Sequence, residues 1–210
     1  MENLSAYLSK KLCLSLGYDK QKEQVLTYGL IAILQFVTIM LLAMIIGFFG
    51  NFMLESIVIF LLVGVLRKST GGAHASTMNG CITMSCLNIT LLAFLSRYVL
   101  IFSIEPWIYL CFYILCYIVC FLIINRYAPV DSPNKRITSQ EKITRLRKQS
   151  YIKAALFMAA SILLTFYSKQ NIRCQSVANS LCLLTLWQCF TLTPSGGRLI
   201  HHLDRLFPKK

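Results

Sequence analysis

The sequence predicts an all-α, polytopic integral membrane protein, with about six transmembrane helices in a single membrane domain that covers residues 1–210. Two observations support this fold class. Of the 210 residues, 56% are hydrophobic and only 14% are charged, whereas a soluble domain carries about 25% charged residues. In addition, several apolar runs approach the roughly 20 residues that a helix needs to cross the hydrocarbon core. A soluble domain of this composition would leave too much apolar surface in water.

Six hydrophobic runs are the predicted transmembrane helices. The first is long and almost purely apolar, the second is short and carries Glu55, and the third is more polar and carries Asn88 and Arg97. The short runs can tilt or extend into the membrane interface. In chain order the runs are Leu26–Phe49, Phe52–Leu66, Cys81–Ile101, Trp107–Ile124, Tyr151–Tyr167 and Cys174–Leu192.

The segment before the first run, residues 1–24, combines apolar residues at helical spacing with Lys10 and Lys11. Two interpretations stay open: an amphipathic helix that lies on the cytoplasmic leaflet, or a simple helical flank of the first run. No cleavable signal peptide is predicted, because the first apolar run begins only near residue 25 and is longer than a signal peptide requires. The apolar residues at helical spacing are Leu4, Tyr7, Leu8, Leu12 and Leu16.

The distribution of basic residues predicts the orientation in the membrane. If both termini lie on one side, then of the 21 Lys and Arg residues only Arg97, Lys169 and Arg173 lie on or near the other side. Cytoplasmic loops carry the excess of Lys and Arg, so both termini and residues 67–81 are predicted to be cytoplasmic in a multi-pass cell-membrane protein. The net charge of +13 is assigned to this topology and to anionic lipid headgroups, and no nucleic-acid partner is predicted.

Residues 67–81 form a polar segment between two hydrophobic runs and carry one base, His74, and one thiol, Cys81. A cysteine attacks carbonyl groups as a thiolate, which a neighbouring base or a helix N-terminus stabilises. In one unbroken helix this spacing would separate the two residues by about 10.5 Å along the axis, too far for proton transfer. Gly71-Gly72 and Asn79-Gly80 supply bends, so the pair is a candidate active site. The alternative is a surface histidine and a packing thiol.

The other histidines and cysteines give weaker signals. A zinc site needs three or four ligands, and His74 with Cys81 supplies two, while His201 and His202 are predicted to lie on the surface of an amphipathic tail. No metal and no cofactor are therefore predicted. Cys13 and Cys174, near the interfaces, stay ambiguous. The remaining cysteines are predicted to pack as small apolar residues: Cys86, Cys111, Cys116, Cys120, Cys182 and Cys189.

The polar segment also carries a family resemblance. The pattern Arg67-Lys-Ser-Thr-Gly71-Gly72-Ala73-His74-x6-Cys81, in a polytopic chain of this length, resembles the accessory gene regulator B (AgrB) family of membrane cysteine peptidases. Residues 127–135 also resemble that family's loop after the fourth hydrophobic run. The resemblance implies that Cys81 is the nucleophile and His74 the general base and acid, and that Arg67, Gly71 and Gly72 shape the site.

The reaction that this resemblance implies has two steps and needs no cofactor. Cys81 cuts a short, AgrD-like precursor peptide after the future C-terminus of a quorum-sensing signal and retains the signal as a thioester. An internal cysteine or serine of the precursor then closes a thiolactone or lactone ring. The resemblance also implies a homodimer in the bacterial cytoplasmic membrane, in contact with lipid.

The basic segment 125–153, predicted to be a cytoplasmic loop, is expected to attract the acidic tail of such a precursor by charge complementarity. Alternatively, its charge is only a signal for topology. The bases assigned to tail binding are Lys135, Arg136, Arg145, Arg147 and Lys148.

Several alternatives stay open at this point. A small transporter or channel would use Glu55, Asn88 and Arg97 as intramembrane polar groups and would not require Cys81. A membrane acyltransferase would use His74 on an acyl donor and leave no cleaved peptide tail. No third member of a catalytic triad is evident. The possible orienting groups are Ser76, Thr77, Asn79, Ser85 and Glu55.

Overall fold

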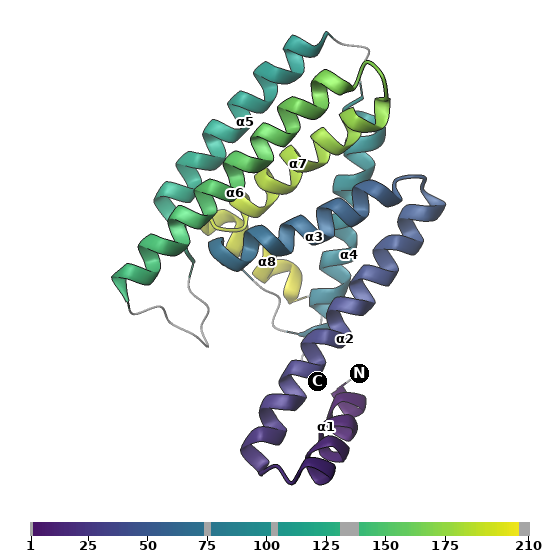
Figure 1. Cartoon of the computed structure of the whole chain (residues 1–210), viewed down its shortest axis with the longest axis vertical. Coiled ribbons are helices and arrows are strands. Elements are labelled where there is room, and N and C mark those ends of the chain that lie inside the picture. The colour runs from purple at the N-terminus through teal and green to yellow at the C-terminus, as the bar shows by residue number, and fades with distance from the viewer. Residues whose placement is uncertain (1, 74–76, 102–104, 131–138, 206–210) are drawn as a thin grey trace. The chain divides into compact units, whose positions relative to one another are not determined.

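The computed structural model describes residues 2–73, 77–101, 105–130 and 139–205, and these residues form helices joined by short connections (Figure 1). The predicted all-α class is therefore confirmed. The elements are α1 (Glu2–Leu16), α2 (Lys20–Phe49), α3 (Met53–Thr70), α4 (Met78–Phe94), the short π-helical continuation η1 (Leu95–Val99), α5 (Pro106–Tyr127), α6 (Gln140–Tyr167), α7 (Ile172–Phe190) and α8 (Pro194–Asp204).

The chain divides into two compact units, residues 1–42 and 43–210. In the smaller unit, α1 packs against the first turns of α2: the hydroxyl oxygens of Ser9 and Thr27 are 2.6 Å apart, and Cys13 is buried. Four of the apolar residues that the sequence pattern identified in α1 are exposed rather than packed against α2: Leu4, Tyr7, Leu12 and Leu16. A helix therefore forms where one was predicted, and its position on a lipid leaflet stays a prediction.

The larger unit is built around α7, which packs against α3, α4, η1, α5 and α6. Figure 1 shows α5, α6 and α7 side by side, with α3 against α7. The centre of the unit is partly polar, because side chains on several faces of α7 are buried. They are Gln175, Ser176, Ala178, Asn179, Ser180, Leu181, Cys182, Leu184, Thr185, Gln188 and Cys189.

Each of the six predicted hydrophobic runs lies within a helix or extends beyond its ends by at most two residues. However, only four helices of the described residues are long and apolar enough to cross a membrane. These are α2, α4 with η1, α5 and α6. The other two, α3 and α7, carry polar side chains that face neighbouring helices rather than lipid, as intramembrane polar groups do when they are satisfied inside a bundle. The count of about six spans accordingly stays a prediction.

The basic segment 125–153 is not the continuous loop that the sequence predicted. Arg126 lies in the last turn of α5, and residues 140–153 form the first half of α6. The helix begins early because residues 140–149 are mostly strong helix formers, such as Gln, Glu, Lys and Arg. In addition, Lys153 Nζ donates hydrogen bonds to Val65 O (2.7 Å) and Ser69 Oγ (3.0 Å), which join this helix to the end of α3.

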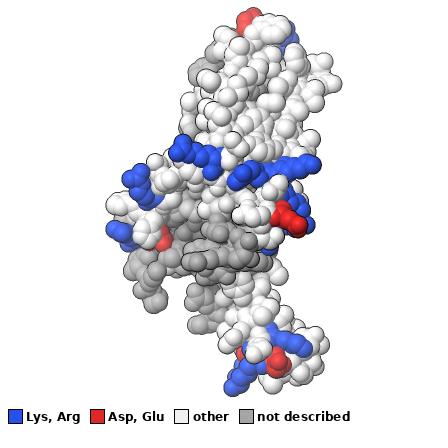
Figure 2. Space-filling view, turned by 90° about the vertical axis from the view of Figure 1, so that its left-hand side faces the viewer, with Lys and Arg blue, Asp and Glu red and all other residues white. Residues whose placement is uncertain are grey.

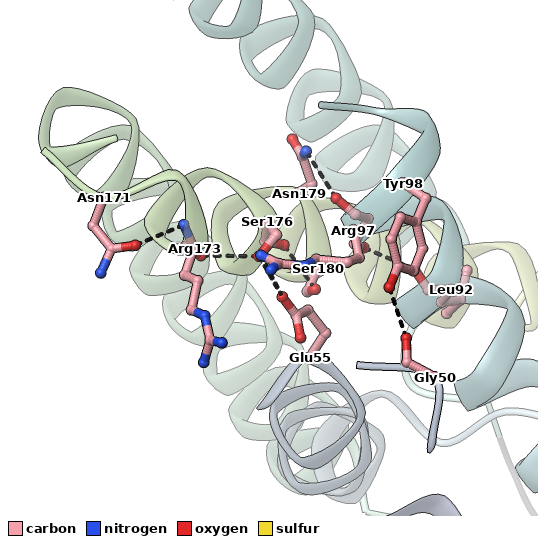
Figure 3. Close-up of polar contacts among 11 residues, drawn as sticks. Gly50, Glu55, Leu92, Arg97, Tyr98, Asn171, Arg173, Ser176, Asn179 and Ser180 are labelled. Carbon is pink, nitrogen blue, oxygen red and sulfur yellow. Dashed lines mark hydrogen bonds and ion pairs between the residues drawn. The ribbon is translucent and has the colours of Figure 1, made fainter. Parts of the chain in front are cut away.

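A buried ion pair lies at the opposite end of α3. Arg97 Nη1 of η1 is 3.9 Å from Glu55 Oε1, and Ser176 Oγ donates a hydrogen bond to the same carboxylate. Close by, Asn179 Nδ2 donates to Leu100 O at 3.1 Å. Figure 3 shows Glu55 pointing between Ser176 and Arg97. These contacts connect α3, η1 and α7. Burying these polar and charged side chains without partners would cost free energy.

Candidate active site

Cys81 lies in the first turn of α4 as a half-buried free thiol. Thr77 caps this helix: its side-chain oxygen accepts a hydrogen bond from Gly80 N at 3.1 Å, and its carbonyl accepts one from Cys81 N at 3.0 Å. Cys81 is thus near a helix N-terminus, where free N–H groups and the helix dipole favour negative charge. His74 lies outside the described residues, which reach Ala73 on one side and resume at Thr77 on the other.

Arg67, in the last turn of α3, is brought close to Cys81. Its Nη2 donates a hydrogen bond to Ala73 O, and its Nε is buried without a hydrogen-bond partner among the described residues. Burial lowers the pKa of the Arg67 guanidinium, and a thiolate charge on Cys81 opposes this change. Because arginine keeps its charge in proteins, a positive charge faces the candidate nucleophile.

The two predicted site glycines occupy positions that exclude a side chain. Gly71 has φ +70°, and a Cβ there would lie 2.1 Å from Val130 O. Gly72 has φ +131°, and a Cβ there would lie 2.9 Å from Thr191 Oγ1. Both φ values fall in the left-handed region that glycine tolerates best. Gly71 also ends α3, since its N–H donates to Arg67 O at 2.9 Å.

Contacts from distant parts of the chain hold the residues that precede His74. Val130 N, after α5, donates to Thr70 O at 2.9 Å, and Ala73 N donates to Thr191 O, after α7, at 3.5 Å. Gln188 Nε2 of α7 donates to Gly71 O at 2.8 Å. Gln188 was not predicted as a site residue, although a glutamine inside the apolar run 174–192 was a signal that could have identified it.

The bases predicted to bind a substrate tail do not act as one group. Lys135 and Arg136 lie outside the described residues, and Arg145 and Lys148 are exposed on α6. Arg147 is partly buried and donates from Nε to Ala128 O at 2.8 Å, so it holds the connection after α5. Figure 2 shows Lys and Arg side chains in a band across one face of the larger unit, beside a surface that is nearly free of charge.

Of the possible orienting groups, two have other contacts. Glu55 is bound by Ser176 and Arg97, and it lies 12 positions before Arg67, which corresponds to about 18 Å of helix. Thr77 uses its side chain to cap α4. Asn79 is exposed, Ser85 is half-buried, and Ser76 lies outside the described residues. A third catalytic group is therefore not identified.

The other cysteines mostly pack as predicted. Cys86, Cys116, Cys120, Cys182 and Cys189 are buried free thiols. The prediction is wrong for Cys111, which is exposed on the outer face of α5. In the described part of the chain, no group of three or more His, Cys, Asp or Glu residues is arranged to hold a metal ion.

Cys81 is expected to react with iodoacetamide at pH 7 faster than Cys13 does. Burial and the nearby carboxylates of Glu23 and Asp19 raise the pKa of the Cys13 thiol, so less of it is thiolate at neutral pH and its rate should climb only in alkaline solution. Cys81, by contrast, faces Arg67 and a helix N-terminus. Peptide mapping of the alkylated full-length protein by mass spectrometry, over a series of pH values, measures both rates. Faster labelling of Cys13 at pH 7 would contradict this prediction.

Comparison with known proteins identifies the family. The profile described as Accessory gene regulator B matches residues 1–192. An AgrB-like protein of Clostridium perfringens strain SM101 is 29% identical over 97% of this chain and 96% of its own length. A second AgrB-like protein, of C. perfringens strain 13, is 26% identical over the same shares, and one of Halalkalibacterium halodurans is 25% identical over 100% of this chain and 95% of its own. No solved structure matches. The chain therefore belongs to the accessory gene regulator B family.

Proposed function

We propose that this protein is a membrane cysteine endopeptidase that removes the C-terminal tail of a quorum-sensing precursor peptide and cyclises the remaining signal. The family takes part in accessory gene regulator peptide processing. The observation that carries the proposal is the pairing of Cys81, at the N-terminus of α4, with the charge of Arg67 at the end of α3. A thiol in such an environment is suited to nucleophilic attack.

In the first step, His74 accepts the proton of Cys81 Sγ, and the sulfur attacks the carbonyl carbon of the scissile peptide bond. The C–N bond breaks, the leaving amine takes the proton from His74, and the signal remains as a thioester on Cys81. The charge of the Arg67 guanidinium, near Cys81, stabilises the oxyanion that forms in this step.

In the second step, a thiol or hydroxyl of the precursor attacks the thioester carbonyl. Its proton passes through His74 to Cys81 Sγ as the carbon–sulfur bond to the enzyme breaks, and the ring closes. No water is consumed, and exchange of one thioester for another is nearly isoenergetic. The ring therefore forms without ATP as long as water is kept away from the thioester.

We further propose that the site faces the cytoplasm and that the protein crosses the membrane six times. The charge distribution assigns residues 67–81 and the basic segment 125–153 to the cytoplasm. These two segments contact each other in the larger unit, because Gly71 packs on Val130 and Lys153 donates a hydrogen bond to Ser69. The Glu55–Arg97 pair is at the other end of α3. The exposed bases Arg145 and Lys148 are on the same side as the site, where they can attract an acidic tail.

Labelling of single-cysteine variants is expected to test this orientation. A cysteine at position 81 should react with a membrane-impermeant maleimide only in inside-out vesicles, and a cysteine at position 169 only in intact cells. The physical reason is the excess of Lys and Arg on the side of residue 81. Labelling of position 81 from outside the cell would reverse the proposed orientation.

Replacing the ring-forming residue of the precursor is expected to separate the two chemical steps. The full-length protein, co-expressed with a candidate precursor from a neighbouring reading frame, should still release the tail of the variant precursor. Intact mass should then show either a thioester adduct on Cys81 or a linear peptide. If a bound variant precursor keeps its tail, the two-step mechanism is wrong. If tail release occurs without Cys81, another protein performs the cleavage, and a transporter or acyltransferase function gains support.

A further inference from the structure

The backbone from Gly71 to Ala73 lies beyond the last hydrogen-bonded turn of α3, so the helix itself does not hold it. Two consecutive glycines make this stretch intrinsically permissive, because glycine has the widest choice of backbone conformation. His74 follows directly, and the proposed chemistry needs its imidazole within about 3–4 Å of Cys81 Sγ. Some other part of the protein must therefore restrict the conformation of this stretch.

Gln188 is the side chain placed to do so. It is 1% exposed, and its Nε2 donates two hydrogen bonds, to Gly71 O at 2.8 Å and to Thr70 Oγ1 at 2.9 Å. A Cβ on Gly72 would lie 3.3 Å from the same nitrogen. The absence of a side chain at residue 72 thus allows the amide to approach the backbone.

We infer that Gln188 is a positioning residue, whose amide fixes the Thr70–Gly72 backbone and thereby holds His74 within reach of Cys81. This inference rests on the proposed function. A buried amide in an apolar helix costs free energy unless its hydrogen bonds are made. In this site both N–H groups are directed at the residues that lead to His74. The rest of α7 is held by five other elements, so it provides a rigid support for the amide.

The same helix offers a matched control in Gln175. This residue is 4% exposed, and its Nε2 donates to Tyr113 Oη at 2.7 Å and to Asn179 Oδ1 at 3.3 Å. It lies 13 residues before Gln188, which corresponds to about 20 Å of helix. Replacing either glutamine by leucine removes a buried amide that donates two hydrogen bonds, but only one of these amides contacts the backbone before His74.

The test compares the rate at which iodoacetamide alkylates Cys81 at pH 7 in the full-length protein and its variants. Gln188→Leu should slow this rate as much as His74→Ala does, roughly tenfold or more, and Gln175→Leu should leave it unchanged. The double variant Gln188→Leu/His74→Ala should be no slower than His74→Ala alone, because residues that act through one another are not additive. With a precursor peptide, Gln188→Leu should lower kcat by roughly 10- to 100-fold and leave KM nearly unchanged.

The outcomes separate this inference from the proposed function. If His74→Ala does not slow alkylation of Cys81, the proposed histidine–cysteine pair is wrong, and the role of Gln188 is overturned with it. If His74→Ala slows the reaction but Gln188→Leu does not, or if both glutamine variants slow it equally, only the positioning role is overturned. If Gln188→Leu does not fold, Gln188→Glu replaces it: its ionised carboxylate has nearly the same size but cannot donate to Gly71 O, and a wild-type rate in that variant overturns the inference.

Discussion

Cys81→Ala is expected to abolish release of the precursor tail, and His74→Ala is expected to slow it by roughly 10³-fold or more. In the proposed mechanism, the first variant removes the sulfur that forms the acyl-enzyme, and no other thiol lies at the start of α4. The second removes the proposed base, which would take and return the proton. Mass spectrometry of the released tail, with the protein amount in the membrane measured in parallel, gives both rates.

Cys116→Ala and Cys182→Ala are the matched controls. Both thiols are buried in the helical core, and their removal leaves only a small cavity, which costs about 1 kcal/mol of stability. Tail release should therefore stay within about twofold of the unmodified protein. Full turnover by purified Cys81→Ala would refute the assignment of the nucleophile.

Gly71→Ala is expected to reduce tail release by about 100-fold or more. The new Cβ would lie 2.1 Å from the carbonyl oxygen of Val130, and this oxygen belongs to backbone that is itself fixed by the bond from Val130 N to Thr70 O. In addition, a non-glycine residue in the left-handed region costs about 1–2 kcal/mol. Since the clash has to be relieved by a shift of the backbone, the stretch that leads to the proposed base His74 should be displaced.

Gly64→Ala provides the comparison for this variant. Gly64 lies within α3, the helix that Gly71 ends, and a Cβ added there would meet no atom within 4 Å. Alanine also favours helix over glycine by about 1 kcal/mol, so this variant should be at least as stable as the parent and fully active. Equal losses of activity in Gly64→Ala and Gly71→Ala, measured at equal protein amounts, would show that the effect does not depend on the close contact with Val130.

The sequence was sufficient to predict the long helices but not the polar contacts between them. Hydrophobic runs predicted where α2, α4, α5 and α6 lie, because long apolar stretches can only be buried or face lipid. The runs of α3 and α7 could be located in the same way. However, hydropathy alone could not show which distant residues pair with the buried polar side chains. Glu55 pairs with Arg97, 42 positions away, and Asn179 pairs with Tyr113, 66 positions away.

The site shows the same limit. Cys81, the glycines and Arg67 could be named as candidates because they are close together in the sequence and form a motif. Gln188 is 117 positions away from Gly71, and only the packing of α7 against α3 brings the two together. The charge of Arg147 was the basis for predicting that it binds substrate. In the structure, its Nε donates a hydrogen bond to Ala128 O instead.

The central place of α7 also has a consequence for biogenesis. The main packing partners of α7, which are α3, α4, η1, α5 and α6, all precede it in the chain, so a ribosome completes these partners before it makes α7. Until then, Glu55 lacks Ser176, Tyr113 lacks Asn179, and Gly71 lacks Gln188. A nascent chain that ends before residue 172 would therefore hold unsatisfied polar groups in its interior and an unsupported glycine pair beside Arg67. If the proposed peptidase activity depends on this support, it can begin only after α7 has packed against α3, and unfinished chains would then be inactive.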